Sequence, residues 1–350
     1  MKKYALIGRR LGHSYSQRWF TSLFARLQLD DHSYSLCEMP SVEGLRSWVK
    51  REGICGMNVT VPFKCDVIGQ LDALDATAQA VGAVNCITVS HTPHGDGLHL
   101  TGHNTDAPAF AETLMAAAGS RWPTDNAPNP VQHFPASAFS QPFDALVLGT
   151  GGAARAVAYA LETLGARPTL ASRNPQKTSA TGSRWPVIGY DDIQRLPSAD
   201  FQLLVNATPV GMHPDVDRSP IDIATLHIHP STLLVYDLVY NPSPTLLMRQ
   251  AAAAGATVTD GLAMLHRQAE LSWMLYSSEQ AHTPLLSKQL HHFENPSVSG
   301  GFFHFLPSSL SGTCSHLLLL CAIPSLYLRY TRSYFCKRKY SRDKEKTSLR

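Results

Sequence analysis

A buried strand that ends in a glycine-rich turn is the feature that most restricts how this chain can fold. Residues 145–148 read Ala-Leu-Val-Leu, four residues rich in glycine follow, and an alanine-rich helical run comes next. Strand, tight turn and helix in this order form the phosphate-binding end of a Rossmann-type unit, where glycines let the backbone approach a pyrophosphate. A tight turn without a ligand is the alternative. The motif predicts a dinucleotide-binding domain whose cofactor contacts include Gly149, Gly151, Gly152 and Ala153.

The residues after the next predicted strand, 168–171, indicate which dinucleotide binds. Ser172, Arg173 and Asn174 follow this strand, and Lys177 lies just beyond. A cofactor without a 2′-phosphate usually meets an Asp or Glu at this place, and this stretch has neither. Arg173 offers a planar, permanently charged fork that suits a phosphate. We therefore expect NADP rather than NAD at Ser172, Arg173 and Lys177; taken alone, Arg173 also fits an exposed surface arginine.

Strands and helices alternate through most of the chain. The pattern predicts strands at 1–8, 33–39, 57–60, 203–206, 233–238 and 257–259, and helices at 19–27, 42–50, 107–118, 245–254 and 262–276. Residues 82–89 and 98–102 flank a turn rich in Gly, Pro and His, which favours a hairpin. The alternation predicts an α/β protein with two domains, a mainly parallel sheet in the first and a Rossmann-type second one, separated by a cleft.

Residues 56–64 look like a strand end that presents a charge. The run Gly-Met-Asn-Val-Thr-Val is followed by Pro62, a residue that often opens a helix, and then by Phe63 and Lys64. On this interpretation Lys64 lies in a first helical turn. A lysine so placed is a candidate acid/base group, whereas a solvated surface lysine is the alternative.

Composition excludes several other classes of protein. Of 350 residues, 44% are hydrophobic and 16% charged, which is typical of a globular protein. Residues 283–350 hold ten Lys/Arg against three Asp/Glu, so the net charge of +3 hides an acidic main part, which argues against a nucleic-acid surface. Seven cysteines without CxxC pairs predict neither a metal site nor disulfides, and the N-terminal apolar run is too short for a signal peptide. We expect a cytoplasmic protein that does not bind membranes.

Two stretches do not fit the alternating pattern. Residues 120–143 contain five prolines and no periodicity, which predicts an irregular insertion. Residues 283–350 change composition abruptly, and the apolar run at 317–323 is too short to span a membrane. For this tail three interpretations stay open: a disordered appendage, a weak interfacial segment, or translation past a natural stop through a frame error, which we favour.

Several motifs occur in an order that resembles the NADP-dependent shikimate dehydrogenase family over residues 1–282. They are Gly-His-Ser-Tyr-Ser at 12–16, Asn-Val-Thr-Val-Pro-Phe-Lys at 58–64, Gly-Ala-Val-Asn at 82–85, Asn-Thr-Asp at 104–106, the glycine-rich loop at 149–155, Asn-Ala-Thr-Pro-Val-Gly-Met at 206–212, and Asp-Gly-Leu-Ala-Met-Leu at 260–265 with Gln268.

The resemblance implies an activity and a role for each residue. The family reduces 3-dehydroshikimate to shikimate on the way to chorismate and the aromatic amino acids. By this likeness Lys64 and Asp106 are the catalytic pair, and Leu238 and Gly261 touch the nicotinamide end of the cofactor, although simple packing also explains these two. The hydroxyls and carboxylate of shikimate would be bound by Ser14, Ser16, Thr60, Asn85, Tyr240 and Gln268.

The resemblance also implies a division of the chain. We expect a substrate-binding domain in 1–106, joined by the helix at 262–282, and a Rossmann domain in 107–261. The partners would be small molecules, and the enzyme a monomer or a homodimer. Two other functions stay open: an NAD-linked quinate/shikimate dehydrogenase, disfavoured by Arg173, and a ligand sensor without catalysis, disfavoured by the presence of both Lys64 and Asp106.

Overall fold

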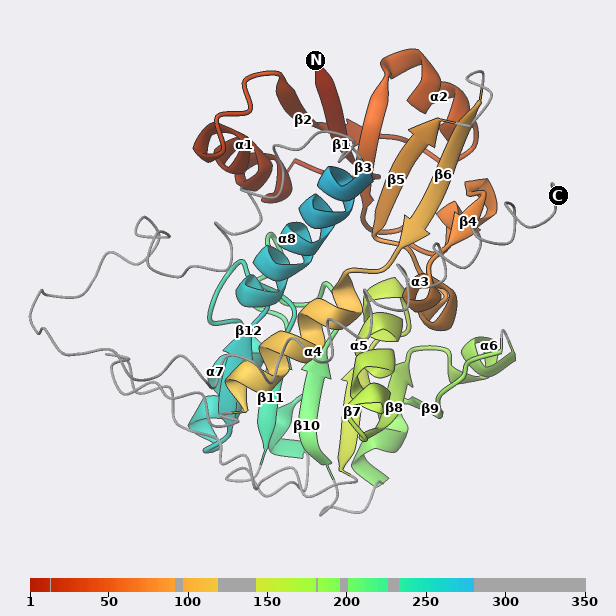
Figure 1. Cartoon of the computed structure of the whole chain (residues 1–350). Helices are drawn as coiled ribbons and strands as arrows, with labels where there is room; N and C mark the ends of the chain where they lie inside the picture. The colour runs from red at the N-terminus through yellow and green to blue at the C-terminus, as the bar shows by residue number, and fades with distance from the viewer. Residues whose placement is uncertain are drawn as a thin grey trace, which may run out of the picture. The chain divides into compact units, whose positions relative to one another are not determined.

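The computed structural model describes residues 1–12, 14–91, 97–118, 143–180, 182–195, 201–225 and 233–279, which all lie in one compact unit. The predicted insertion, apart from residue 143, and the predicted tail lie outside the described residues. In the part that is described, two six-stranded sheets are flanked by helices (Figure 1). The predicted α/β class is confirmed.

The first sheet, sheet A, has the strand order β2-β1-β3-β5-β6-β4. Only β5 runs against its neighbours, so the sheet is mainly parallel, as predicted. The predicted hairpin is β5 and β6. The strands are β1 (Lys2–Gly8), β2 (His32–Glu38), β3 (Ile54–Val59), β4 (Ala73–Leu74), β5 (Cys86–His91) and β6 (Leu98–His103); the helices of this half are α1 (Ser16–Arg26), α2 (Leu45–Glu52), the 3₁₀ helix η1 (Asp66–Gln70) and α3 (Ala76–Val81).

The second sheet, sheet B, is parallel throughout, with the order β12-β11-β10-β7-β8-β9. Strand order reverses beside β7, which is the arrangement of a doubly wound nucleotide-binding fold. Its elements are β7 (Asp144–Leu148), α5 (Gly152–Thr163), β8 (Arg167–Ser172), α6 (Pro175–Ala180), β9 (Val187–Gly189), η3 (Tyr190–Arg195), β10 (Phe201–Asn206), η4 (Ile223–Thr225), β11 (Leu234–Asp237), α7 (Leu246–Ala253) and β12 (Thr257–Asp260).

Two helices connect the halves. α4 (Asp106–Ala117) follows β6, and α8 (Leu262–Glu279) follows β12 and runs beside α4 to sheet A (Figure 1). Residues of α4, α5, α8 and sheet B share one apolar cluster, while α8 also packs with α1 and β1 in another. Burial of these apolar side chains therefore holds both helices between the sheets. No helix among the described residues combines the length and the apolar content needed to cross a membrane.

Short elements were missed by the sequence patterns because they carry little periodicity. α3, with six residues, is set by its ends: the Asp75 side chain accepts from Ala78 N at 2.6 Å, and Gly82 closes the helix with φ of 66°. The prediction that Pro62 opens a helix was wrong. Phe63 N donates to Thr60 O at 3.0 Å, so the chain turns and buries the Phe63 ring, and η1 begins only at Asp66.

Candidate active site

Lys64 and Asp106 form an ion pair in which Lys64 Nζ lies 2.6 Å from Asp106 Oδ2. Lys64 leaves the turn after β3, and Asp106 is the first residue of α4, where a negative charge meets the positive end of the helix dipole. Their side chains are only 14% and 6% exposed. The surface-lysine interpretation is therefore wrong, and Asp106 rather than a helical turn provides the environment of Lys64.

Asn85 holds the other oxygen of the same carboxylate. Its Nδ2 donates to Asp106 Oδ1 at 2.9 Å and to Thr105 Oγ1 at 2.8 Å, while its Oδ1 accepts from Thr105 N at 2.7 Å. A contact of 3.4 Å to Gln268 Oε1 is the longest of the set. The Asn85 side-chain amide has two N–H groups, and its two short bonds use both of them. The Gln268 oxygen can therefore accept from another donor. Four predicted residues, Lys64, Asn85, Asp106 and Gln268, are thus brought together.

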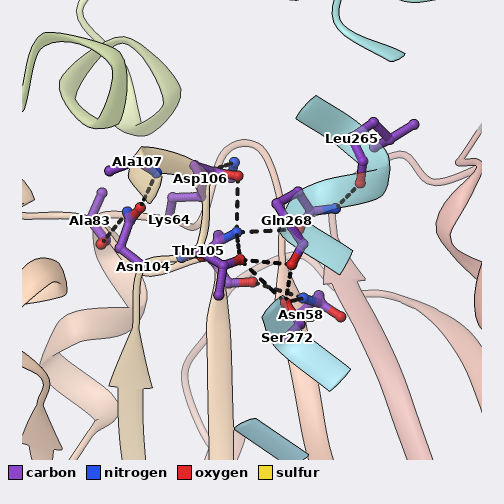
Figure 2. Close-up of polar contacts among 11 residues, drawn as sticks. Asn58, Lys64, Ala83, Asn104, Thr105, Asp106, Ala107, Leu265, Gln268 and Ser272 are labelled. Atoms are coloured by element: carbon purple, nitrogen blue, oxygen red, sulfur yellow. Dashed lines mark hydrogen bonds and ion pairs between the residues drawn. The ribbon is translucent and has the colours of Figure 1, made fainter. Parts of the chain in front are cut away.

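A second layer of polar side chains lies behind these four, and no role was predicted for it. Asn58 Nδ2 donates to Ser272 Oγ at 2.9 Å, and Asn58 Oδ1 accepts from the Tyr34 hydroxyl at 2.9 Å. Thr105 Oγ1 donates to the Gln268 carbonyl at 3.0 Å (Figure 2). Asn58 and Thr105 stand within the motifs, and Ser272 lies one helical turn beyond Gln268. That spacing is the only signal that sequence offers for Ser272.

The remaining predicted substrate residues have other hydrogen-bond partners. Ser16 N donates to Ser14 Oγ at 3.3 Å, and the Tyr240 phenol lies beside the backbone of Tyr15, where burial raises its pKa. Thr60 N donates to Ile7 O at 2.9 Å. Among the described residues, no hydrogen bond joins Ser14, Ser16, Thr60 or Tyr240 to the Lys64–Asp106 pair.

The glycine-rich loop joins β7 to α5 as predicted. Gly149 has φ of 111°, which favours glycine, and a Cβ there would meet the Ala207 carbonyl oxygen at 3.3 Å. Gly151 precedes α5, is exposed, and has open space around a Cβ position. A Cβ on Gly152 would lie 2.7 Å from the Lys64 Cβ, so this glycine lets Lys64 pack directly on the loop. Half-buried Ala153 follows within α5.

The predicted phosphate-binding residues follow β8. Ser172 is buried, and its hydroxyl lies 2.9 Å from Thr178 Oγ1 and accepts from Asn174 N at 3.1 Å. Arg173 and Lys177 are exposed, and neither side chain has an ion pair among the residues described. Burial raises the pKa of Tyr190, and the nearby Arg173 charge opposes that rise. The two cations are available for an anionic ligand.

Leu238 and Gly261 touch one another. A Cβ on Gly261 would lie 2.2 Å from the Leu238 carbonyl oxygen, so only glycine fits between β12 and α8. Packing therefore accounts for Gly261 whether or not a cofactor contacts it.

A buried carboxylate that no prediction included lies at the end of β11. Asp237 Oδ1 accepts from Asn206 Nδ2 at 2.9 Å and from Val239 N at 3.0 Å, and Oδ2 accepts from Thr245 Oγ1 at 2.7 Å. Asn206 Oδ1 in turn accepts from Thr208 N at 3.0 Å. Burial raises the pKa of Asp237 to about 6, against the lowering effect of these hydrogen bonds. We call this group the Asp237 cluster.

A cavity of about 160 Å³ lies between the end of α3 and the start of α5. It is lined by Gly82, Thr150, Arg155 and Trp185 among others, and neither Lys64 nor Asp106 borders it. The cavity therefore lies beside the glycine-rich loop rather than at the ion pair.

Comparisons with known proteins identify the family of this chain. A family model described as the shikimate dehydrogenase substrate binding domain matches residues 6–87. The shikimate dehydrogenase (NADP(+)) of Bacillus licheniformis is 32% identical over 294 residues, which cover 81% of this chain and 94% of the relative. The chain belongs to the shikimate dehydrogenase family.

Solved shikimate dehydrogenases have the same fold. The Thermus thermophilus enzyme, in complex with NADP(H) and shikimate, matches with a TM-score of 0.61 and 31% identity over 79% of this chain and 94% of that one. A quinate dehydrogenase from Corynebacterium glutamicum, in complex with NAD, matches with a TM-score of 0.61 at 26% identity, over 79% of this chain and 94% of that one. The fold therefore accommodates both dinucleotides, and the choice between them depends on particular residues.

Proposed function

We propose that this chain catalyses the reversible, NADPH-dependent reduction of 3-dehydroshikimate to shikimate, a step of chorismate and aromatic amino-acid biosynthesis. The observation that carries the proposal is the 2.6 Å contact of Lys64 Nζ with Asp106 Oδ2, held from the other side by Asn85. Relatives named as NADP-dependent shikimate dehydrogenases, at 30–36% identity over most of the chain, support it.

The residues at the glycine-rich loop fit the proposed cofactor. Gly151 is exposed at the start of α5, where backbone amides favour a pyrophosphate, and Arg173 and Lys177 offer two exposed cations for a 2′-phosphate. The loop packs on Lys64 through Gly152, which brings the dinucleotide side and the ion pair together. When bound, the nicotinamide supplies the hydride.

Lys64 would act as the acid in the direction of reduction. As the carbonyl carbon gains a hydride, negative charge develops on its oxygen, and Lys64 Nζ delivers a proton to that oxygen to give the alcohol. Asp106 orients the ammonium and accepts from the product hydroxyl through charge-assisted hydrogen bonds. In the oxidation direction Lys64 takes the same proton back.

The polar groups around the pair would bind the substrate. The Gln268 oxygen has only a long contact with Asn85, so it can accept from a substrate hydroxyl. Ser14, Ser16, Thr60 and Tyr240 would complete the site for the carboxylate and the other hydroxyls. A site built of such partners rejects analogues that leave them unpaired.

The proposal includes the arrangement of the chain and its setting. Residues 1–106 with 262–282 would form the substrate-binding domain, and residues 107–261 the NADP domain. The reaction would take place in the cytoplasm, which agrees with Cys37, Cys55, Cys65 and Cys86 being free thiols. The enzyme would act on small molecules as a monomer or a homodimer, which light scattering would distinguish.

Steady-state rates with NADP and NAD, each with shikimate and quinate, test the proposed function. We expect the highest kcat/KM for NADP with shikimate. A preference for NAD with quinate would instead identify a quinate dehydrogenase. Binding of shikimate without turnover in any combination would support the sensor and refute the proposal.

A further inference from the structure

Ser272 occupies the centre of the polar layer behind the active site. Its Oγ accepts from Asn58 Nδ2 at 2.9 Å, donates to the Gln268 carbonyl at 2.8 Å and lies 3.3 Å from Thr105 Oγ1. The side chain is fully buried. One hydroxyl thus connects α8 to the end of β3 and to the residue that precedes α4, as Figure 2 shows.

These contacts lead to the proposed substrate-binding side chains. Asn58 Nδ2 also donates to the Asn85 carbonyl at 3.3 Å, and Thr105 Oγ1 accepts from Asn85 Nδ2 at 2.8 Å. Gln268 receives two hydroxyl donors on its own carbonyl, from Ser272 and Thr105. Ser272 therefore connects the segments that carry Asn85 and Gln268, although it contacts neither of their carboxamides.

The position of Gln268 depends on this connection more than that of Asn85 does. The Asn85 carboxamide has three short bonds, two with Thr105 and one with Asp106, whereas the Gln268 carboxamide is held by Leu265 O at 2.9 Å and by the 3.4 Å contact with Asn85. Leu265 belongs to α8 itself, so its bond does not set where the helix lies relative to sheet A. Apolar packing and the bonds of Ser272 and Thr105 contribute to that alignment.

We propose that Ser272 is a positioning residue for substrate binding: its hydroxyl sets α8 against Asn58 and Thr105, and thereby places the Gln268 carboxamide beside Asn85 and the Lys64–Asp106 pair. The inference rests on the proposed function, because it assigns Gln268 to the substrate. The ligand concerned is the polyhydroxylated ring acid itself.

Ser272→Ala removes the hydroxyl without adding volume and leaves Asn58 Nδ2 with only the Asn85 carbonyl. We expect KM for shikimate to rise about tenfold, the effect of one lost neutral hydrogen bond, with kcat within about twofold and KM for NADP unchanged. Ser272→Cys keeps the shape with a somewhat larger atom that hydrogen-bonds weakly, so its KM should be intermediate. In a Gln268→Ala background the effect of Ser272→Ala on KM should disappear.

Ser277→Ala is the matched control. Ser277 lies on the same helix, is 5% exposed, and donates only to the helix carbonyl of Met274 at 3.1 Å. We expect Ser277→Ala to keep the wild-type KM and kcat. If a loss of helix stability alone raised KM, both variants would show the rise.

Crystal structures of the wild type and of Ser272→Ala test the positional part without reference to turnover. Displaced Gln268 and Asn58 carboxamides in the variant are expected, and unchanged positions would overturn the inference. If the wild type oxidises shikimate and Ser272→Ala has the same KM, the inference is wrong while the proposed function stands. If the wild type fails to oxidise shikimate, the proposed function is wrong, and the two crystal structures still decide whether Ser272 positions Gln268.

Discussion

Two buried carboxylates, one in each half of the molecule, have opposite kinds of partners. Asp106 faces the Lys64 ammonium and the Asn85 amide. Asp237 is fully buried, but its partners Asn206, Thr245 and the Val239 amide are all neutral. A buried charge without a counter-charge is costly, and burial accordingly raises the pKa of Asp237 to about 6.

The difference separates a site for chemistry from a structural connection. In the Lys64–Asp106 pair a cation faces the carboxylate, and in the proposed mechanism it would deliver a proton to the substrate oxygen. The Asp237 cluster instead ties the end of β10 to the N-terminus of α7, where Thr245 also accepts from Met248 N. Through Asn206 it also holds Thr208, whose Cγ2 would meet a Cβ on Gly149 at 3.3 Å. Asp237 therefore helps to fix the residues that pack beneath Gly149 of the glycine-rich loop.

The largest expected effect comes from removing the cation of the first pair. Lys64→Ala should lower kcat by about 10³-fold, within the range for loss of a general acid, while shikimate binding changes little. Rapid-mixing kinetics and calorimetric titration with shikimate measure the two quantities. Normal turnover in this variant would remove Lys64 from the mechanism and end the distinction between the two carboxylates.

A pH-dependent effect on stability is expected for the second carboxylate. A carboxyl with a pKa of about 6 in the folded chain, and about 3.9 unfolded, binds its proton more tightly when folded. Its contribution to stability therefore falls by about 3 kcal/mol as the pH rises from about 4 to above 6. Urea unfolding measures the free energy of unfolding of the wild type and of Asp237→Asn. Over this pH range the wild type should lose stability relative to the variant.

Asp217→Asn is the control for that measurement, because Asp217 is an exposed acid in the same half. It should unfold like the wild type at every pH. Parallel pH curves for the wild type and Asp237→Asn would mean that Asp237 holds no excess proton in the folded state.

A smaller effect is expected at the exposed cations of the cofactor half. Arg173→Ala should raise KM for NADP by about tenfold, the cost of one solvent-accessible charge-assisted hydrogen bond, and leave KM for NAD and for shikimate unchanged. Arg249→Ala, which removes an exposed arginine on α7, is the control for net charge. An equal rise in KM for NADP and for NAD would place Arg173 away from the 2′-phosphate.

The smallest effect is expected from truncation after residue 282. The Lys64–Asp106 pair, the Asp237 cluster and all predicted site residues precede residue 280. We expect kcat/KM within about twofold of the full chain, measured by NADP-linked oxidation of shikimate. A loss of activity above about tenfold would show that residues 283–350 take part in function.

The two halves were also unequally predictable. Five strands of sheet B were predicted from apolar runs and from the glycine turn at Gly149, because a parallel strand buried on both faces leaves a continuous signal, and only the short β9 was missed. In sheet A the motifs located Lys64, Asn85 and Asp106, but the local structure at Lys64 was predicted wrongly. Proline rules describe helix starts and turns alike, and packing of Phe63 decided between them.

By itself, the sequence determined the α/β class, the strand–glycine–helix unit and the motifs that carry the family resemblance, since these depend on local periodicity and residue type. Only the tertiary structure decided the 2.6 Å contact within the expected pair of Lys64 and Asp106, that Gly152 is small because Lys64 packs on it, and that Ser272 and Asp237 are buried in hydrogen-bonded clusters. The physical reason is separation along the chain. Asn58 and Ser272 lie 214 residues apart, and no local pattern records a hydrogen bond between side chains that meet only when two sheets and a helix pack together.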